Sequence, residues 1–161
     1  MKHLRVIGLE SDENSFMKMA EDESLLKFVS SGSGLPALRF YQWKNEAVSV
    51  GYFQSVEKEI NVENCKKDNI EIFRRLTGGG AVYKYPPGEL NYSIVVPEDW
   101  ISGDILESYK KIGEAIIIGL KKCGISAEFA GINDICVNGK KISGNAQTRK
   151  FGCILQHGTI L

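Results

Sequence analysis

The run Arg74-Arg75-Leu76-Thr77-Gly78-Gly79-Gly80-Ala81-Val82-Tyr83 places three consecutive glycines between two apolar, strand-like segments. Residues without side chains let successive backbone N–H groups converge on one ligand, and such a nest attracts phosphate or carboxylate oxygens. Two arginines precede the glycines, and a guanidinium binds either anion through paired hydrogen bonds. The alternative is a tight β-turn with solvated arginines, and the strand that follows at once argues against it. The run therefore predicts an anion-binding site.

A second group of polar residues lies between positions 133 and 147. Asn138-Gly139 supplies the two positive φ angles of a type I′ turn, which predicts a hairpin. Lys141 on that hairpin is a candidate fixed cation for a phosphate or a developing carboxyl charge. Asp134 is a candidate oxygen ligand for Mg²⁺ or a ribose hydroxyl. Two lysines after Asn-Gly also fit a solvated hairpin tip, and Asp134 also fits a turn or cap.

Apolar periodicity predicts many short strands and two long helices. Helices are expected over 13–29 and 104–122. The apolar face of the first would contain Phe16, Met17, Met19, Ala20, Leu25, Phe28 and Val29. Strands are expected over 4–9, 37–43, 47–53 and 90–96, with Asn45-Glu46 turning a hairpin. The pattern predicts one α+β domain over 1–161, with a mixed, largely antiparallel sheet and packed helices.

Composition excludes several classes of function. Lys+Arg and Asp+Glu both number 20, so the net charge is zero, and no nucleic-acid partner is expected. No apolar stretch approaches the roughly 20 residues of a membrane span, so no membrane partner is expected. The four cysteines are far apart and form no metal-binding pair, which favours reduced thiols and a cytoplasmic protein.

These motifs together resemble the lipoate–protein ligase family. The signature R-R-x-[ST]-G-G-G-A-V-[FY]-H, followed by L-N-[FY]-[ST], is similar to residues 74–84 and 90–93. The later signatures G-K-K-[IF]-[SA]-G-[NS]-A and L-Q-H-G match residues 139–146 and 155–158. The resemblance runs from about residue 4 to residue 161. It implies the biotin/lipoate ligase catalytic fold, which is class II synthetase-like.

The resemblance implies an ATP-dependent enzyme. Such an enzyme joins lipoate to ATP with the help of Mg²⁺ and releases pyrophosphate. It then passes the lipoyl group from lipoyl-AMP to a lysine of the lipoyl domain of a 2-oxoacid dehydrogenase, or of the glycine-cleavage H protein. Lys141 matches the family's catalytic lysine, and Asp134 is the candidate Mg²⁺ ligand. The residues implied to bind ATP and lipoyl-AMP are Arg75, Gly78, Gly79, Gly80, Ala81, Val82, Tyr83, Asn133, Asp134 and Lys141.

The sequence departs from the family in two places. Lys84 stands where the family usually has a histidine. The chain also ends just after L-Q-H-G, whereas family catalytic domains usually continue. We therefore expect that a C-terminal part and an accessory domain, or a separate accessory ligase subunit, are missing from residues 1–161.

Two other functions fit the same residues. An octanoyltransferase of this fold moves octanoyl from acyl carrier protein through a cysteine thioester, and one branch places that cysteine shortly before the lysine hairpin. Residues 130–134 contain no cysteine, and Cys136 lies nearby in an apolar strand. The other alternative is a non-catalytic lipoate-binding module that needs a separate partner. The ATP-dependent ligase is the main prediction.

Overall fold

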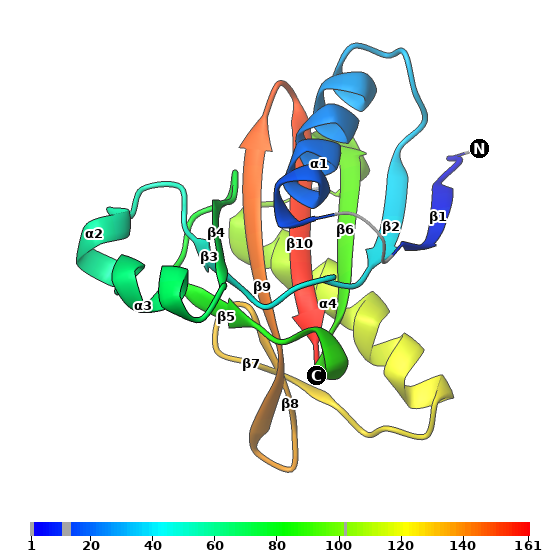
Figure 1. The fold of residues 1–161 in the computed structure, drawn as a ribbon. Helices are drawn as coiled ribbons and strands as arrows, with labels where there is room; N and C mark the ends of the chain where they lie inside the picture. The colour runs from blue at the N-terminus through cyan, green and yellow to red at the C-terminus, as the bar shows by residue number, and fades with distance from the viewer. Residues whose placement is uncertain (1, 11–13, 102) are drawn as a thin grey trace.

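The structure is a computed structural model that describes residues 2–10, 14–101 and 103–161 (Figure 1). It contains two sheets and two long helices. The elements in chain order are β1 (Arg5–Glu10), α1 (Ser15–Ser30), β2 (Ala37–Tyr41), β3 (Ala47–Val50), α2 (Val56–Glu59), α3 (Val62–Lys67), β4 (Glu71–Arg74), β5 (Val82–Lys84), η1 (Pro86–Gly88), β6 (Leu90–Pro97), η2 (Glu98–Trp100), α4 (Ile105–Lys122), β7 (Glu128–Ala130), β8 (Asp134–Val137), β9 (Lys140–Lys150) and β10 (Cys153–Ile160).

The larger sheet has seven strands in the order β1-β2-β6-β10-β9-β8-β7. Only β1 and β2 run parallel among these described pairs, and the other neighbours are antiparallel. The α+β class with a mixed, largely antiparallel sheet is therefore confirmed. β10 is one continuous strand, and it pairs along its whole length with β6 and β9.

The two long helices cover opposite faces of this sheet (Figure 1). Leu26 of α1 packs in one buried cluster with Val95 and Leu155. The next residue of β6 and the preceding residue of β10, Val96 and Ile154, pack on the other face with α4. This alternation follows from the two-residue period of a strand, and each fully buried aliphatic side chain contributes about 1.5–3 kcal/mol.

The α1 helix buries a different face from the one predicted. Its buried residues are Ser15, Lys18, Asp22, Leu26 and Val29, whereas Phe16, Met17 and Phe28 are exposed. Glu13, which the prediction included, lies outside the described residues. The buried set recurs every three or four residues and so shares one helix face. Its first half is polar because it meets buried polar groups of the large sheet.

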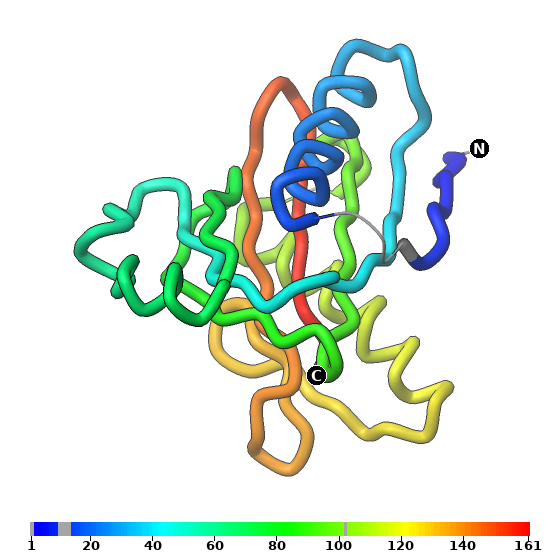
Figure 2. The backbone as a smooth tube through the Cα atoms, in the orientation of Figure 1, coloured from blue at the N-terminus to red at the C-terminus, as the bar shows by residue number. Residues whose placement is uncertain are grey.

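The smaller sheet has the order β4-β3-β5. The predicted hairpin at Asn45-Glu46 is wrong, because β2 and β3 belong to different sheets. β3 pairs with β4 along one edge and with β5 along the other, so neither edge is left for β2. Figure 2 shows the chain crossing between the sheets after β2. This crossing puts the two sheets on either side of one cavity.

The start of the predicted helix over 104–122 and the predicted hairpin at Asn138-Gly139 are confirmed. Asp104 caps α4 in a capping box with Glu107, which satisfies backbone N–H groups of the first turn. Asn138 and Gly139 have φ angles of 50° and 73° and join β8 to β9 in the predicted hairpin. The hairpin brings residues 133–147 beside the cavity.

Candidate active site

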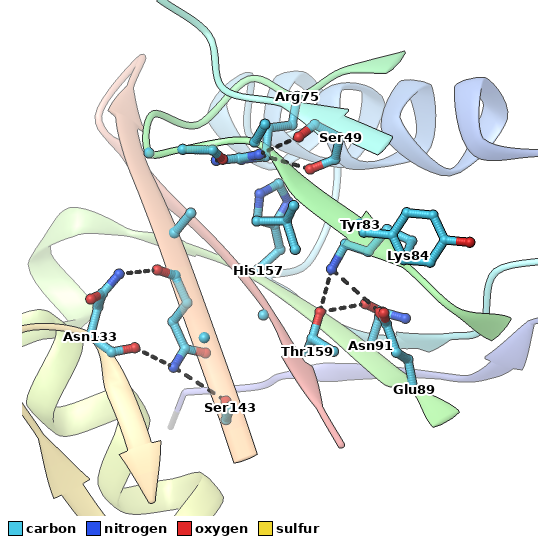
Figure 3. Close-up of a pocket in the computed structure, with 18 of the residues that line it drawn as sticks. Ser49, Arg75, Tyr83, Lys84, Glu89, Asn91, Asn133, Ser143, His157 and Thr159 are labelled. Atoms are coloured by element: carbon cyan, nitrogen blue, oxygen red, sulfur yellow. Dashed lines mark hydrogen bonds and ion pairs between the residues drawn. The ribbon is translucent and has the colours of Figure 1, made fainter. Parts of the chain in front are cut away.

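A cavity of about 540 Å³ opens between the two sheets (Figure 3). Its walls come from β9, β10, the small sheet and the loop that contains residues 78–81. Nine of the ten predicted site residues line it: Arg75, Gly78, Gly79, Gly80, Ala81, Val82, Tyr83, Asn133 and Lys141. The structure therefore brings the two sequence motifs together, although they are about 60 residues apart in the chain. A cavity of this size is typical of a small-molecule site.

One end of the cavity is aromatic. The Trp43 ring lies 5.2 Å from that of Tyr41 and 5.1 Å from that of Phe73, centroid to centroid. Met19 packs against this cluster and also lines the cavity. Burial raises the pKa of the Tyr41 phenol well above its usual value of 10.0, so this ring stays neutral. The end is suited to an apolar chain.

Lys84 adds a buried charge beside this aromatic end. Its ammonium lies 2.5 Å from Thr159 Oγ1 and 3.4 Å from Glu89 Oε2 (Figure 3). The same nitrogen is 5.7 Å from the centre of the Trp43 ring. Burial lowers the pKa of Lys84 from its ordinary value of 10.5, and the Glu89 carboxylate opposes that shift. The residue that replaces the family histidine is therefore part of the cavity wall.

The triple-glycine loop depends on backbone that only glycine adopts easily. Gly79 has a φ angle of +96°, which other L residues rarely reach. A Cβ atom on Gly79 would lie 2.9 Å from Arg75 Nη2, and one on Gly51 would lie 2.0 Å from the Gly79 carbonyl oxygen. Both positions need glycine so that the loop can approach the small sheet.

Arg75 binds this loop through its guanidinium group. Its Nε donates to Thr77 Oγ1 at 3.1 Å, and its Nη1 donates to the carbonyl and hydroxyl oxygens of Ser49 at 3.2 and 2.7 Å. Its Nη2 donates to the carbonyl oxygens of Gly78 and Gly80, both at 2.8 Å. These bonds use all five N–H donors of a guanidinium. Arg75 therefore organises the loop, which differs from the predicted role of direct anion ligand.

The loop's own N–H groups face a different direction. In a trans peptide the N–H points opposite to the preceding carbonyl, so the Gly79 N–H points away from Arg75. The N–H groups of Gly78, Gly79 and Gly80 have no hydrogen-bond partner among the described residues. They are available to an oxyanion, and the anion-binding role stays a prediction.

Lys141 lies on the opposite wall. Its ammonium is 2.8 Å from Asp134 Oδ1, and its side chain remains 55% exposed. A Cβ atom on Gly144 would lie 3.0 Å from Lys141 Cε, so the missing side chain of Gly144 gives the lysine its place. The β8–β9 pairing thus presents a partly solvated cation to the cavity.

Asp134 lies beside Lys141 and is not part of the cavity wall. Within the described part of the chain, no group of three His, Cys, Asp or Glu side chains is placed to hold a metal ion. Mg²⁺ is usually held by one or two carboxylates that face a substrate phosphate, whereas the Asp134 carboxylate pairs with an ammonium and lies outside the cavity wall. The predicted Mg²⁺ site at Asp134 does not fit these residues, and we derive no step through it.

Asn133 has a positioning contact. Its amide nitrogen donates to the Asn145 carbonyl, and the Asn145 amide donates back to the Asn133 carbonyl at 2.8 Å. This reciprocal pair fixes the start of β8 against β9 (Figure 3). Asn133 thereby supports the hairpin that carries Lys141.

Sequence reasoning missed the buried polar residues behind the loop. His157 lines the cavity and contacts Thr77 and Asp22. Asp22 also binds Arg39, and both side chains are almost completely buried. The signal was present in the α1 sequence, where Lys18 and Asp22 share a helix face with the core residue Leu26.

The comparisons with known proteins agree with this geometry. A sequence model of the lipoyl protein ligase A/B catalytic domain matches residues 14–161. The chain belongs to this family. Curated relatives of this catalytic domain, 36–40% identical to it, carry the name octanoyltransferase LipM. One of them, from Carboxydothermus hydrogenoformans, is 40% identical over 89% of the chain and 59% of the relative's length.

Solved structures show the same fold. A Thermoplasma acidophilum protein described as a lipoate protein ligase, with bound lipoic acid, superimposes with a TM-score of 0.84 at 34% identity. The match covers 100% of this catalytic domain and 68% of that chain. A bipartite lipoate protein ligase from the same organism, described with its E2 lipoyl domain, gives a TM-score of 0.83 at 30% identity. It covers 100% of this domain and 62% of that chain.

The predicted lipoate–protein ligase activity is wrong. The curated relatives are octanoyltransferases, and their reaction differs from the ATP-dependent formation of an acyl-adenylate. The glycine loop and the lysine hairpin did not distinguish the two, because both reactions place negative charge on oxygens near an acyl carbon. The family and the fold are confirmed.

Two further facts bound the interpretation. This catalytic domain spans about three fifths of the length of the curated relatives it matches, at 62% and 59% of the first two. In the described part of the chain, every helix is too short or too polar to cross a membrane.

Proposed function

We propose that this catalytic domain transfers an octanoyl group from a carrier-bound thioester to a lysine amine, without ATP. The relatives' activity supports this proposal, and so does the two-ended character of the cavity. One end is aromatic, and the other carries the glycine-loop amides and Lys141. The observation that carries the proposal is the location of these two polar groups on opposite walls of one cavity.

The cavity suits an acyl chain with a reactive carbonyl at its head. The alkyl chain would lie toward Trp43 and Phe73, where apolar surface leaves water at about 25 cal/mol per Å². The carbonyl would lie between the N–H groups of the glycine loop and Lys141. Donors fixed in this way stabilise an oxyanion without reorganising during the reaction.

The reaction itself is an acyl transfer between sulfur and nitrogen. The neutral amine of the acceptor lysine attacks the thioester carbonyl, and the C–N bond forms as the oxyanion develops. When the oxyanion collapses, the C–S bond breaks and the carrier thiolate leaves. The proton lost by the amine balances the proton gained by the thiolate. A thioester is already activated, so neither ATP nor Mg²⁺ enters this scheme.

The proposal does not route the acyl group through a cysteine of this chain. All four cysteines are within the described residues, and none lines the cavity. Cys136 comes nearest to the site in the sheet register, where it pairs with Lys141. No cysteine thiol of the cavity wall could therefore carry the thioester intermediate expected for an octanoyltransferase. Direct attack by the acceptor amine fits the residues of the cavity better.

The acceptor we propose is the lysine of a lipoyl domain, from a 2-oxoacid dehydrogenase or the glycine-cleavage H protein. A relative described together with its E2 lipoyl domain supports this class of partner. We also propose that a further domain or a separate accessory subunit completes the whole protein, since longer relatives share this catalytic part. Four unpaired cysteines agree with a cytoplasmic location.

The test is a transfer assay with purified protein. An octanoyl thioester of an acyl carrier protein is incubated with a lipoyl domain, with and without ATP and Mg²⁺. The proposal predicts octanoylation of the acceptor at the same rate in both, and none when the acceptor lysine is replaced by Arg. If the domain binds octanoate but transfers nothing from the thioester under any condition, the proposal is wrong.

A further inference from the structure

A chain of hydrogen bonds connects α1 to the triple-glycine loop. Asp22 Oδ2 lies 2.9 Å from His157 Nδ1, and His157 Nε2 lies 2.7 Å from Thr77 Oγ1. Thr77 Oγ1 in turn accepts from Arg75 Nε at 3.1 Å. Arg75 then reaches the carbonyl oxygens of Gly78 and Gly80. The chain begins 55 residues before Thr77 and ends at the cavity wall.

The donors along this chain form a consistent series in which each group donates to the next. A guanidinium has no acceptor, so Arg75 must donate to Thr77 Oγ1. The Thr77 hydroxyl then uses its own proton to donate to His157 Nε2. His157 Nδ1 consequently carries the ring proton and donates it to Asp22. In the opposite tautomer the lone pair of Nδ1 would face the Asp22 carboxylate, which only accepts hydrogen bonds.

The far end of this chain is anchored by buried charge. Asp22 Oδ1 accepts from Arg39 Nη1 at 2.9 Å, and Arg39 also pairs with Glu21. The Arg39 guanidinium lies 4.3 Å from the centre of the Tyr41 ring. Asp22 is therefore held from both sides, and its second oxygen stays directed at His157. Such a group has little freedom to reorient.

The near end controls the orientation of Arg75. The guanidinium is planar, so the bond from Nε to Thr77 fixes the direction of Nη2 as well. Turning that plane would break both bonds to the glycine carbonyls. The peptide planes that orient the N–H groups of Gly79 and Ala81 would then be free to rotate. His157 itself has both ring nitrogens engaged, which leaves it no free nitrogen to act as a base on substrate.

We propose that Asp22 and His157 are positioning residues that act through Thr77 and Arg75 to aim the N–H groups of Gly79 and Ala81 at the acyl carbonyl. The inference rests on the proposed acyl transfer for its kinetic consequence, whereas the hydrogen-bond chain stands on geometry alone. The proposal can therefore be tested in two separate ways. One measures the tautomer of His157 by spectroscopy, and the other measures the rate of acyl transfer.

The spectroscopic test measures the tautomer of His157 by nitrogen NMR on histidine-labelled protein. The chain has only one other histidine, the exposed His3, and a His3→Gln variant leaves a single signal to interpret. The inference predicts the neutral Nδ1–H form. Thr77→Val should keep that form and shift the Nε2 resonance, because the hydroxyl donor is lost. An Nε2–H form in the unsubstituted protein overturns the inference, whether or not the domain transfers octanoyl.

The kinetic test compares two substitutions at the same position. Thr77→Ser keeps the hydroxyl and should keep the rate within about threefold, whereas Thr77→Val should lower kcat about 10- to 100-fold with little change in KM. The loss falls on kcat because the oxyanion contact forms in the transition state. His157→Gln gives a second variant should Thr77→Val fail to fold, and it should also lower kcat. Equal kcat in Thr77→Val and wild type would overturn the inference, and absence of transfer in wild type would instead refute the proposed function.

Discussion

Lys141 Nζ lies 2.8 Å from Asp134 Oδ1, across the hairpin that the Asn138-Gly139 turn closes. The pair is partly exposed, so it adds little to the free energy of folding. Its consequence is geometric, because the carboxylate restrains a flexible ammonium beside the cavity. The Lys141–Asp134 pair therefore serves the site more than the stability of the sheet.

Replacing Lys141 with Ala should lower the transfer rate by about 10²–10³-fold, because a cation matched to the oxyanion is lost. The melting temperature should stay close to that of the wild type, since Lys141 is more than half exposed. Lys140→Ala is the matched control, because Lys140 is next to Lys141 in the chain and does not line the cavity. Steady-state transfer kinetics and thermal unfolding measure both effects. Near-normal transfer by Lys141→Ala would remove the lysine from the mechanism.

Gly79→Ala should destabilise the protein by about 1–2 kcal/mol and weaken the site. The φ angle of +96° and the contact with Arg75 both oppose a Cβ atom at this position. Gly80→Ala is the control, because a Cβ atom there meets nothing within 4 Å. Chemical denaturation and transfer kinetics on the two variants should differ clearly. Similar behaviour of the two would contradict the role assigned to the loop.

Lys84 should give stability a pH dependence above neutrality. Burial lowers its pKa in the folded protein below the ordinary 10.5 of the unfolded chain. At a pH between the folded and the unfolded pKa, the unfolded chain therefore binds more protons than the folded one. Wild-type stability should therefore rise relative to Lys84→Met as the pH increases through that window. Urea unfolding of both proteins from neutral to alkaline pH measures the difference, since other groups are shared. A difference that is constant with pH, or that favours the variant as pH rises, would show that Lys84 is not penalised by burial.

Cys136→Ser should transfer octanoyl at nearly the wild-type rate. The thiol lies opposite Lys141 in the sheet register but outside the cavity wall, so the direct route does not use it. Cys153→Ser would be a poor control because Cys153 is buried in the core, whereas Cys123→Ser is exposed and suitable. Loss of transfer in Cys136→Ser alone, with a trapped acyl group on the wild-type chain, would establish a thioester intermediate instead.

Several parts of the fold could be read from the sequence because the signals are local. Asp104 with Glu107 marks the start of α4, and Asn138-Gly139 marks the β8–β9 turn, since caps and turns depend on a few neighbouring residues. The motifs around Gly79 and Lys141 likewise identified two walls of one cavity.

The predictions that were wrong depended on distant contacts. A hairpin at Asn45-Glu46 was plausible locally, but the edges of β3 are taken by β4 and β5. The buried face of α1 is set by Arg39 and His157, which lie far along the chain from Asp22. The five bonds of Arg75 inside the protein could not be predicted either, because they depend on how the loop folds.

The most direct measurement offers the protein two acyl donors at once. A deuterated octanoyl thioester of a carrier protein and unlabelled octanoate with ATP and Mg²⁺ are mixed with a lipoyl domain, and the intact mass of the acceptor reports which acyl group was transferred. Our account predicts that the acceptor lysine gains the deuterated group. An acceptor that carries the unlabelled group, with release of pyrophosphate, would contradict it.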